Sequence, residues 1–277
     1  MMKKRRIKKS IKKIIAIIFF TLTIITIAFC SYKIVLWAHD NKKTKEITKD
    51  INEQITITTS EEEIIDIIDP ETPKEDPVWS YDASLVKNVD LSKLYQINNE
   101  TVGWIIMENT QINYPVVQHE DNDYYLNRSF DKSINGAGWV FMDYRNNAKE
   151  MDRNTIIYAH GRLDYTMFGS LRKTLNEKWY NNPENYIINY STDNYNSLWQ
   201  IFSLYKIPTT NDYLQINFAN DEEYVNWLNM LKDRSIYDFK TNVSSENKTI
   251  TLSTCYNDDE KLVVHAKLIK IQNKTEN

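Results

Sequence analysis

The first pattern along the chain is a continuous apolar run over residues 14–31, IIAIIFFTLTIITIAFCS. Only three threonines and a final serine interrupt it. At about 1.5 Å per residue the run spans roughly 27 Å, close to the hydrocarbon thickness of a bilayer. Residues 32–38, YKIVLWA, lengthen it and add aromatic side chains suited to the membrane interface. The pattern therefore predicts a transmembrane helix over residues 14–38.

The residues on either side of this run set its expected orientation. Residues 1–13 contain eight basic residues and no acidic one. Basic residues stay on the cytoplasmic side of a membrane, so we expect a cytoplasmic N-terminus and an extracellular body. A cleaved signal peptide would have a shorter apolar core followed by a small-residue cleavage site, and neither is evident. We therefore predict a single-pass signal anchor in the cell membrane.

A polar segment follows the apolar run. Residues 39–77 mix acidic, basic and threonine residues and contain three prolines near their end. This composition is typical of a linker, with room for a short helix. From about Val78 the chain changes to short, aromatic-rich apolar segments. We therefore predict an acidic stalk over 39–77 and a folded domain over 78–277.

The folded part is predicted to be mainly β. One amphipathic helix is predicted over 220–235, where Asn220 can cap the first turn together with Glu223. Many strands without regular β–α alternation favour a barrel or sandwich with inserted helices. The segments that read as strands are 111–118, 138–144, 154–160, 199–207, 248–255 and 261–271.

Composition and charge narrow the function classes. The formal net charge is −4, and without the eight basic residues of the N-terminus the remainder carries −12. A strongly acidic body is not expected to bind nucleic acid. The five glycines lie between Gly103 and Gly169 and none forms a phosphate-binding loop, which argues against nucleotide chemistry. We see no metal-ligand cluster, and the acidic loops alone do not indicate a calcium site, so no metal or cofactor is expected.

The chain contains two cysteines, Cys30 in the apolar run and Cys255 at the end of the segment 249–255, TITLSTC. They cannot pair across that separation, so the exported body is expected to lack a disulfide, which is unusual for a structural cysteine outside the cell. Strand alternation places Ile250 and Leu252 on one face and Cys255 with the polar side chains on the other. This placement favours a reactive thiol over a buried, inert one.

A nucleophilic thiol needs a proton acceptor or a cation nearby. Among the four histidines, His39 abuts the apolar run, His119 lies in a polar loop and His265 lies within a predicted strand, where a structural role is expected. His160 instead ends a predicted strand and is followed by Gly161 and a loop. Catalytic groups carried on strands are usually displayed at such positions. His160 is therefore the candidate partner of the thiol.

Taken together, the order and spacing of several segments resemble the class B sortases of Gram-positive bacteria, over nearly the whole exported body. A helix preceding the cysteine strand belongs to the same resemblance. The segments are VGWIIMENTQINYPVVQHEDNDYYLNRSF (102–130), GAGWVFMDYRN (136–146), TIIYAHG (155–161), MFGSL (167–171), TLSTC (251–255) and LVVHAKLI (262–269).

This resemblance implies a fold and an activity. The fold would be a closed eight-stranded β-barrel with helices at its edges. The activity would be that of a membrane-anchored cysteine transpeptidase that cleaves a sorting signal, of the NPxT or SPxT kind, after its threonine. The implied partners are exported proteins with a C-terminal sorting signal, and peptidoglycan or its lipid-linked precursor, whose amine receives the acyl group.

The resemblance also assigns roles to residues. Cys255 would be the nucleophile and His160 its proton partner. Six further positions match those that line the sorting-signal groove of the family: Asn122, Leu126, Tyr158, Thr209, Ser253 and Thr254.

One position departs from the family. Class B sortases are expected to have an arginine at the start of the last strand, but this chain has Lys261, after a shorter connection from Cys255. Arginine offers a rigid fork of donors, whereas lysine is a flexible point charge. Three alternatives follow: Lys261 stabilises the oxyanion, Arg162 replaces the arginine, or catalysis is impaired.

Two other functions are compatible with parts of this sequence. A papain-like cell-wall hydrolase would place its cysteine at a helix N-terminus and its histidine later in the chain, which is the reverse of the order of His160 and Cys255. A non-catalytic module that keeps the barrel for binding or scaffolding is supported by Lys261. Thiol reactivity separates this module from an enzyme, because a binding module needs no activated cysteine.

Overall fold

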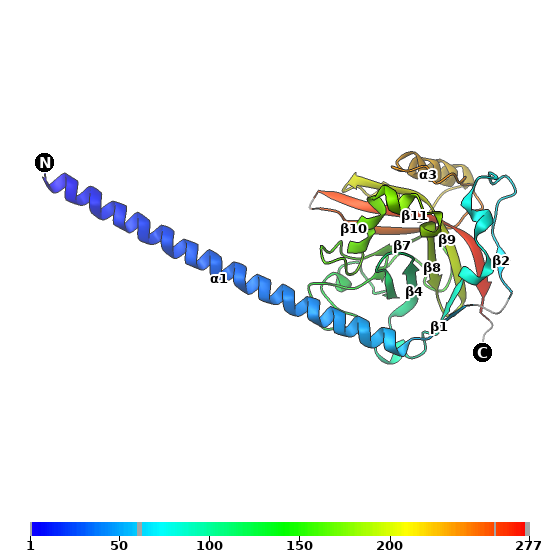
Figure 1. Cartoon of the computed structure of the whole chain (residues 1–277), viewed down its shortest axis with the longest axis horizontal. Helices are drawn as coiled ribbons and strands as arrows, with labels where there is room; N and C mark the ends of the chain where they lie inside the picture. The colour runs from blue at the N-terminus through cyan, green and yellow to red at the C-terminus, as the bar shows by residue number, and fades with distance from the viewer. Residues whose placement is uncertain (1, 60–62, 258, 275–277) are drawn as a thin grey trace. The chain divides into compact units, whose positions relative to one another are not determined.

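The computed structural model describes residues 2–59, 63–257 and 259–274 (Figure 1). The chain forms two compact units, residues 1–46 and 47–277. The first is helical, and the second contains the β-structure.

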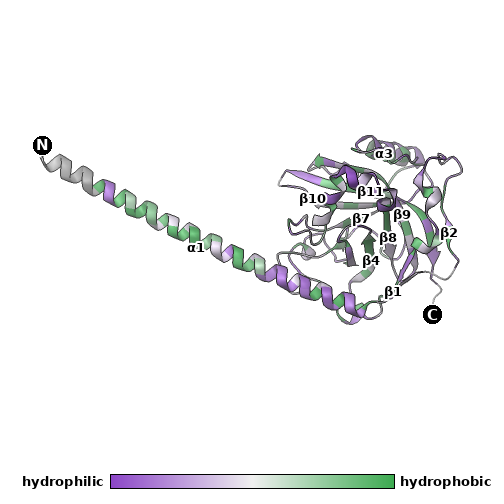
Figure 2. Cartoon of the chain, in the orientation of Figure 1, coloured by the Kyte–Doolittle hydropathy of each residue, from purple (hydrophilic) through white to green (hydrophobic). Residues whose placement is uncertain are grey.

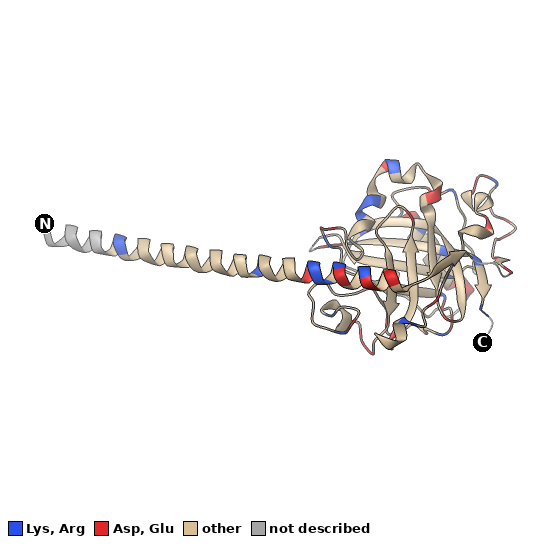
Figure 3. Ribbon diagram, turned by 60° about the horizontal axis from the view of Figure 1, so that its bottom comes forward, with Lys and Arg blue, Asp and Glu red and all other residues tan. Residues whose placement is uncertain are grey.

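A single helix, α1 (Met2–Gln54), contains the predicted apolar span. From Ile11 onward it is long and apolar enough to be a candidate membrane span. Figure 2 shows apolar residues along its middle and hydrophilic residues toward its end, and Figure 3 shows most of the charged residues of the helix in that same final part. Salt bridges one turn apart, Lys42–Glu46 at 3.7 Å and Lys49–Glu53 at 3.6 Å, support the helix beyond the span. The helix therefore continues into the segment predicted as a stalk.

Eight strands of the second unit close into a barrel. Their order around it is β10-β7-β6-β5-β4-β8-β9-β11, and pairing of β10 with β11 closes the ring. The β10–β7 and β5–β6 pairs are parallel and the other pairs are antiparallel. The closed barrel implied by the family resemblance is confirmed. The strands are β4 (Thr101–Met107), β5 (Asn113–Val117), β6 (Phe141–Met142), β7 (Asn154–Tyr158), β8 (Ile187–Ser191), β9 (Tyr195–Pro208), β10 (Thr249–Cys255) and β11 (Glu260–Asn273).

Each segment predicted as a strand overlaps one, with β9 and β11 longer than predicted, but the barrel strands β4 and β8 were not predicted. The predicted segment 138–144 shortens to the two residues of β6. Strand β8 is buried at all five positions, and β4 is buried at five of seven with the other two half-buried. Strands covered on both faces lose the apolar–polar alternation by which a half-buried strand is recognised. Burial on both faces weakens this signal in β4 and β8, as it also does in the predicted strands β9 and β10.

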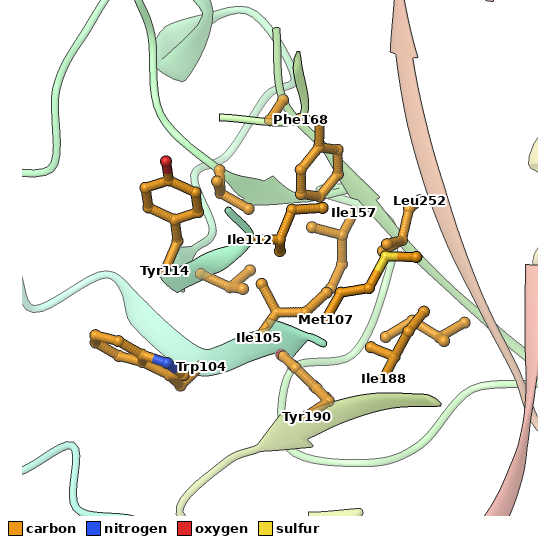
Figure 4. Close-up of a cluster of buried hydrophobic side chains, with 14 of the residues drawn as sticks. Trp104, Ile105, Met107, Ile112, Tyr114, Ile157, Phe168, Ile188, Tyr190 and Leu252 are labelled. Atoms are coloured by element: carbon orange, nitrogen blue, oxygen red, sulfur yellow. The ribbon is translucent and has the colours of Figure 1, made fainter. Parts of the chain in front are cut away.

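The barrel interior holds the main hydrophobic core. Figure 4 shows side chains from β4, β5, β7, β8 and β10 pointing toward one another. Gly103 in β4 allows close packing here, because a Cβ at this position would lie 2.6 Å from the ring of Tyr190. Buried members of this core include Trp104, Ile105, Met107, Ile112, Tyr114, Ile157, Phe168, Ile188, Tyr190 and Leu252.

Helix α3 (Asp221–Asp233) confirms the predicted amphipathic helix and builds a second core. The Oδ1 atom of Asn220 accepts a 2.9 Å hydrogen bond from the backbone N–H of Glu223. The carboxylate of Glu223 accepts one from the backbone N–H of Ala219, at 2.6 Å. The buried face of the helix packs against β9 and β11, in a cluster that contains Tyr224, Trp227, Leu228, Leu231, Phe202, Tyr205, Tyr213 and Val263.

Residues between α1 and the barrel pack along its edge. Strand β1 (Ile57–Thr59) pairs with β3 (Lys87–Val89), and β2 (Ile65–Asp66) pairs with β11. Asp76, 2% exposed, accepts hydrogen bonds from the backbone N–H of Val78 at 2.9 Å and the side chain of Gln200 at 2.6 Å. This part of the predicted stalk therefore contributes to the second unit.

Short helices complete the unit. They are η1 (Pro77–Ser80), η2 (Ala83–Leu85), η3 (Leu94–Gln96), η4 (Tyr124–Leu126), η5 (Gly169–Leu175), α2 (Glu177–Tyr180), η6 (Pro183–Tyr186) and η7 (Asp212–Leu214).

We expect Asn220→Ala to lower the free energy of unfolding by about 1 kcal/mol, because the substitution removes the N-cap acceptor of α3. Denaturant unfolding of the full chain in detergent measures this change. The matched control is Asn220→Asp, which keeps an oxygen at the same position and is expected to retain most of the stability. An equal loss in both variants would show that the cap does not stabilise α3.

Candidate active site

Strand β10 carries the candidate nucleophile to an exposed position. Ile250 and Leu252 face the main core, as the alternation predicted. On the opposite face Thr251 and Ser253 are also buried, beneath the α3 layer. Only at Cys255, the last residue of β10, does this face reach solvent. The exposure of the thiol therefore comes from its place at the strand end and not from a solvent-facing strand.

His265 contacts the buried face of β10 through Thr251. Its Nδ1 lies 2.8 Å from the hydroxyl of Thr251 and its Nε2 lies 2.8 Å from the hydroxyl of Tyr205. Burial lowers the pKa of His265 to about 3. Both ring nitrogens are thus engaged inside the protein and the ring is neutral at physiological pH. His265 is a structural side chain, as expected.

The hairpin between β10 and β11 places the ammonium of Lys261 beside the sulfur of Cys255. Cys255 and Lys261 are directly opposite each other in the antiparallel pair. The Nζ atom of Lys261 lies 3.0 Å from Sγ of Cys255. The turn between them is closed by a 2.8 Å hydrogen bond from the N–H of Tyr256 to the carbonyl of Glu260. The short connection noted in the sequence therefore fixes lysine and cysteine as neighbours.

The residue after the cysteine is held by two further cations that sequence reasoning did not identify. Arg172, from η5, donates a hydrogen bond to the carbonyl of Tyr256, and its guanidinium lies 4.5 Å from the centre of the Tyr256 ring. The ammonium of Lys206 lies 4.6 Å from the same ring centre. Such contacts between a cation and a ring face are attractive. No motif in the sequence connects these three positions.

His160 is brought to the cysteine by parallel strand pairing. Ser253 of β10 lies opposite Tyr158 of β7. Two residues further on lie Cys255, the last residue of β10, and His160, just past the end of β7, so the register carries both to the same end of the barrel. At Gly161 an added Cβ would lie only 1.8 Å from the carbonyl oxygen of Cys255, which shows how closely the two backbones approach. His160 and Cys255, which are 95 positions apart in the sequence, therefore meet at the same end of the barrel.

The orientation of the His160 ring is fixed by backbone contacts. Its Nε2 lies 2.7 Å from the carbonyl oxygen of Leu126. A carbonyl oxygen only accepts, so Nε2 carries a proton and Nδ1 is the nitrogen left for a second partner. Gly138 has φ +63°, and a Cβ there would lie 2.9 Å from Cδ2 of His160. Only glycine fits comfortably beside the ring.

Two groove candidates share one buried carboxylate that was not among the predicted site residues. Asp143 is fully buried, and its Oδ2 accepts hydrogen bonds from Tyr158 Oη at 2.8 Å and Asn122 Nδ2 at 3.1 Å. Arg145 binds both carboxylate oxygens, at 2.8 and 2.7 Å. A network of this kind fixes the side chains that it contains. Asp143 therefore connects Asn122 and Tyr158 to a common anchor.

The same network shifts the pKa values of Asp143 and Tyr158. Burial alone would raise the pKa of Asp143, but hydrogen bonds from Arg145 and Tyr158 hold that pKa below the ordinary aspartate value. Burial, and next the charge of Asp143, raise the pKa of Tyr158 well above that of a free phenol. Asp143 is therefore charged and Tyr158 is neutral at physiological pH.

The other groove candidates differ in accessibility. Leu126 is half-buried and offers its carbonyl to His160, and Thr209 is exposed, with its N–H 3.3 Å from the carbonyl of Asp259. Ser253 and Thr254 are both 4% exposed. The hydroxyl of Ser253 lies 3.0 Å from that of Tyr213, and Thr254 donates to the carbonyl of Ala159 at 2.7 Å. The last bond ties β10 to the residue preceding His160.

Arg162, the alternative cation, is bonded within its own loop. Its Nε lies 3.1 Å from the hydroxyl of Thr166 and 3.4 Å from the carboxylate of Asp164. Lys261, in contrast, contacts the sulfur directly. The geometry therefore favours Lys261 over Arg162 as the cation that acts beside Cys255.

The assembled groups are suited to acyl transfer. A thiol, an imidazole and an ammonium come from the ends of β10, β7 and β11 and supply a nucleophile, a proton carrier and a positive charge. In the part of the chain that the structure describes, no three His, Cys, Asp or Glu side chains are grouped as metal ligands would be.

Comparison with known proteins identifies similar chains. A model of the sortase domain matches residues 105–269, more than half of the chain. Sortase B of Staphylococcus aureus (strain NCTC 8325 / PS 47) is 37% identical over 182 residues, 64% of this chain and 74% of that protein. The structure of sortase B from B. anthracis in complex with AAEK1 is 39% identical with a TM-score of 0.61, covering 72% of this chain and 90% of that one. A Staphylococcus aureus sortase B–substrate complex is 36% identical with a TM-score of 0.61, covering 65% and 84%.

We expect Asp143→Asn to lower the free energy of unfolding by about 2 kcal/mol at neutral pH, because hydrogen bonds to a charged group are replaced by weaker neutral ones. Arg145 is 42% exposed, so solvent screening limits its share of this loss. Since the folded-state pKa of Asp143 is lowered, its stabilisation is present above about pH 4 and is lost as the pH falls through the folded-state pKa.

The measurement is denaturant unfolding of both chains at neutral pH and below pH 4, where their difference is expected to shrink. Asp123→Asn, at an exposed position without a capping bond, is the matched control and is expected to have little effect. A difference that does not depend on pH would contradict the role of the Asp143 charge.

Proposed function

Since the chain belongs to the sortase family and, within it, to class B, whose members are cysteine transpeptidases, we propose that it cleaves a sorting signal after threonine and transfers the exported protein to a peptidoglycan amine. The observation that carries this proposal is the exposed sulfur of Cys255, with the ammonium of Lys261 3.0 Å away and His160 at the adjoining strand end.

In the first step the thiolate of Cys255 attacks the threonine carbonyl of the sorting signal. A C–S bond forms, and the tetrahedral oxyanion is stabilised by Lys261 and by backbone N–H groups near the cysteine. The C–N bond then breaks, and the departing amine takes a proton from His160. Because Nε2 of His160 is bound to the carbonyl of Leu126, we assign this proton to Nδ1. The product is a thioester on Cys255.

In the second step an amine resolves the thioester. The amine attacks the thioester carbonyl and loses a proton to Nδ1 of His160, and the C–S bond breaks to return the Cys255 thiolate. The family implies that this amine belongs to peptidoglycan or its lipid-linked precursor, with water as a slow alternative. The same cation and proton carrier therefore serve both steps.

As the proposed oxyanion donor, Lys261 differs from an arginine in geometry. Its ammonium is a point charge on a flexible chain, whereas a guanidinium is a rigid fork with two parallel donors. Pairing of Lys261 with Cys255 across the hairpin restricts this flexibility. Loss of a single oxyanion donor typically costs about 2.7–4 kcal/mol of transition-state stabilisation. We therefore propose a working enzyme in which the cation is held by strand register.

The sorting signal is proposed to bind beside the Asp143 network. Asn122, Leu126, Tyr158 and Thr209 are the accessible candidates and would contact the peptide. Ser253 and Thr254 are buried, so we propose that they support the groove from below. The Staphylococcus aureus sortase B–substrate complex supports a peptide-binding role for this barrel.

The proposed location is the cell membrane. Helix α1 would be a single-pass anchor with a cytoplasmic N-terminus and an extracellular catalytic domain, supported by the apolar span and the eight basic residues before it. Substrate and cell-wall precursor would both meet the enzyme at the outer surface of this membrane.

A non-catalytic binding or scaffold module is the second candidate function. The observation that favours it is the replacement of arginine by Lys261. A module of this kind needs no accessible cysteine paired with a cation, so the contact between Lys261 and Cys255 argues for the enzyme.

The test incubates the full chain in detergent with a panel of sorting-signal peptides and detects a thioester on Cys255 by mass spectrometry. We expect an adduct in the wild type and none in Cys255→Ala. Lys261→Ala is expected to slow adduct formation about 10²–10³-fold, because an oxyanion donor is lost. Lys261→Arg is expected to form the adduct at least as fast as the wild type.

Cys30→Ala is the matched control, since it removes the other cysteine and leaves the barrel intact; it is expected to react like the wild type. A wild type without adduct that gains one in Lys261→Arg would indicate impaired catalysis. No adduct in either chain, with an unreactive Cys255, would favour the binding module.

A further inference from the structure

We propose that Lys261 is a site of self-acylation, at which its amine receives the acyl group from the Cys255 thioester in competition with the external acceptor. This proposal rests on the proposed function, because it requires the thioester. It is carried by the 3.0 Å separation of Nζ and Sγ and by the cross-strand pairing of the two residues.

The geometry keeps the amine close to the reacting carbon. In the thioester, the carbonyl carbon is bonded directly to Sγ, the atom that Nζ already contacts. Groups held at near-attack distances of about 3–3.5 Å react with effective molarities that reach about 10⁵–10⁸ M. The amine of Lys261 therefore has a large advantage over an amine that must diffuse to the site.

The hairpin that holds the pair is braced on both sides. Its turn is closed by the bond from Tyr256 to Glu260, and the side chain of Asn257 donates to the carboxylate of Glu260 at 2.7 Å. Arg172 adds a hydrogen bond to the carbonyl of Tyr256. Because both strands continue into the barrel, the backbone of Lys261 cannot move away from that of Cys255 without opening this turn.

The step balances without another reactant. The neutral amine of Lys261 attacks the thioester carbonyl, a C–N bond forms and the C–S bond breaks. The electron pair of that bond leaves on Sγ of Cys255, and the proton released by the nitrogen passes to Sγ through His160 or water. A thioester and an amine become an amide and a thiol. No oxidant or reductant takes part.

This reaction is specific to lysine at position 261. A guanidinium stays protonated and is a poor nucleophile, so an arginine in the same place would supply charge without accepting the acyl group. Lysine does both in turn: as an ammonium it stabilises the oxyanion, and as a free amine it attacks the thioester. The reaction is therefore slowed by protonation and increases with pH.

Acylation of Lys261 removes the positive charge beside Cys255, because an amide nitrogen is neutral. The modified chain loses the proposed oxyanion donor and with it transpeptidase activity. External amines protect the enzyme by resolving the thioester first. Lys261 therefore makes the lifetime of the active enzyme depend on the supply of acceptor amines. Activity declines when sorting signals are present and acceptor amines are scarce.

The experiment incubates the full chain in detergent with a sorting-signal peptide, without an acceptor amine, from about pH 7 to about pH 9. Each sample is divided, and one half is treated with hydroxylamine, which cleaves thioesters and leaves amides. Intact mass and peptide mapping then locate the acyl group. We expect a hydroxylamine-labile adduct on Cys255 first and a resistant adduct on Lys261 later, with a rate that rises up to about tenfold per pH unit.

Two variants make the assignment specific. Lys261→Arg is expected to form the labile adduct and no resistant one. Lys206→Arg removes the neighbouring lysine, whose ammonium lies over the Tyr256 ring, and is expected to keep the resistant adduct. Added triglycine, a free amine, is expected to suppress the resistant adduct and preserve activity.

The outcomes separate this proposal from the proposed function. A wild type that accumulates the labile adduct on Cys255 but no resistant adduct on Lys261 overturns self-acylation alone. A resistant adduct that persists in Lys261→Arg also overturns it, since another amine would then be the acceptor. A chain that forms no thioester at all overturns both proposals.

Discussion

The position of β10 between β7 and β11 is the constraint on which the rest of this site depends. Its parallel register with β7 brings His160 to the end of the barrel where Cys255 emerges, and its antiparallel register with β11 places Lys261 across from the sulfur. The same pairing closes the barrel. A slip of one residue in either pair would turn alternate side chains to the other face and separate the three groups. Closure of the barrel and assembly of the site therefore depend on the same strand pairings.

Strand register alone does not orient the side chains, and buried polar contacts supply that information. The carbonyl of Leu126 selects the protonated nitrogen of His160, and the bond from Thr254 to Ala159 holds the two strand ends together. Asp143 fixes the side chains of Asn122 and Tyr158, two of the residues proposed to line the groove. These groups are costly to bury without partners, so each contact also stabilises the fold. The contacts that orient the proposed catalytic groups therefore also stabilise the fold at this end of the barrel.

The choice of lysine at position 261 has consequences beyond the strength of one charge. A guanidinium keeps its proton through a reaction cycle, whereas an ammonium can release one and become a nucleophile. The 3.0 Å contact with Cys255 places that chemistry at the atom that we propose carries the acyl group. A substitution that conserves charge can therefore add a reaction, because the two side chains differ in proton release as well as in shape.

The sequence by itself determined the features encoded by local periodicity and chemistry. The apolar run, the cap and apolar face of α3, the separation of Cys255 from Ile250 and Leu252, and the choice of Cys255 and His160 as candidates all follow from local sequence. Only the tertiary structure decided which strands are neighbours, that β4 and β8 are buried on both faces, and that Asp143 and Arg172 support the site. It also decided that Lys261, not Arg162, contacts the sulfur. The physical reason is that contacts between strands far apart in the chain depend on register and closure, which no local pattern specifies.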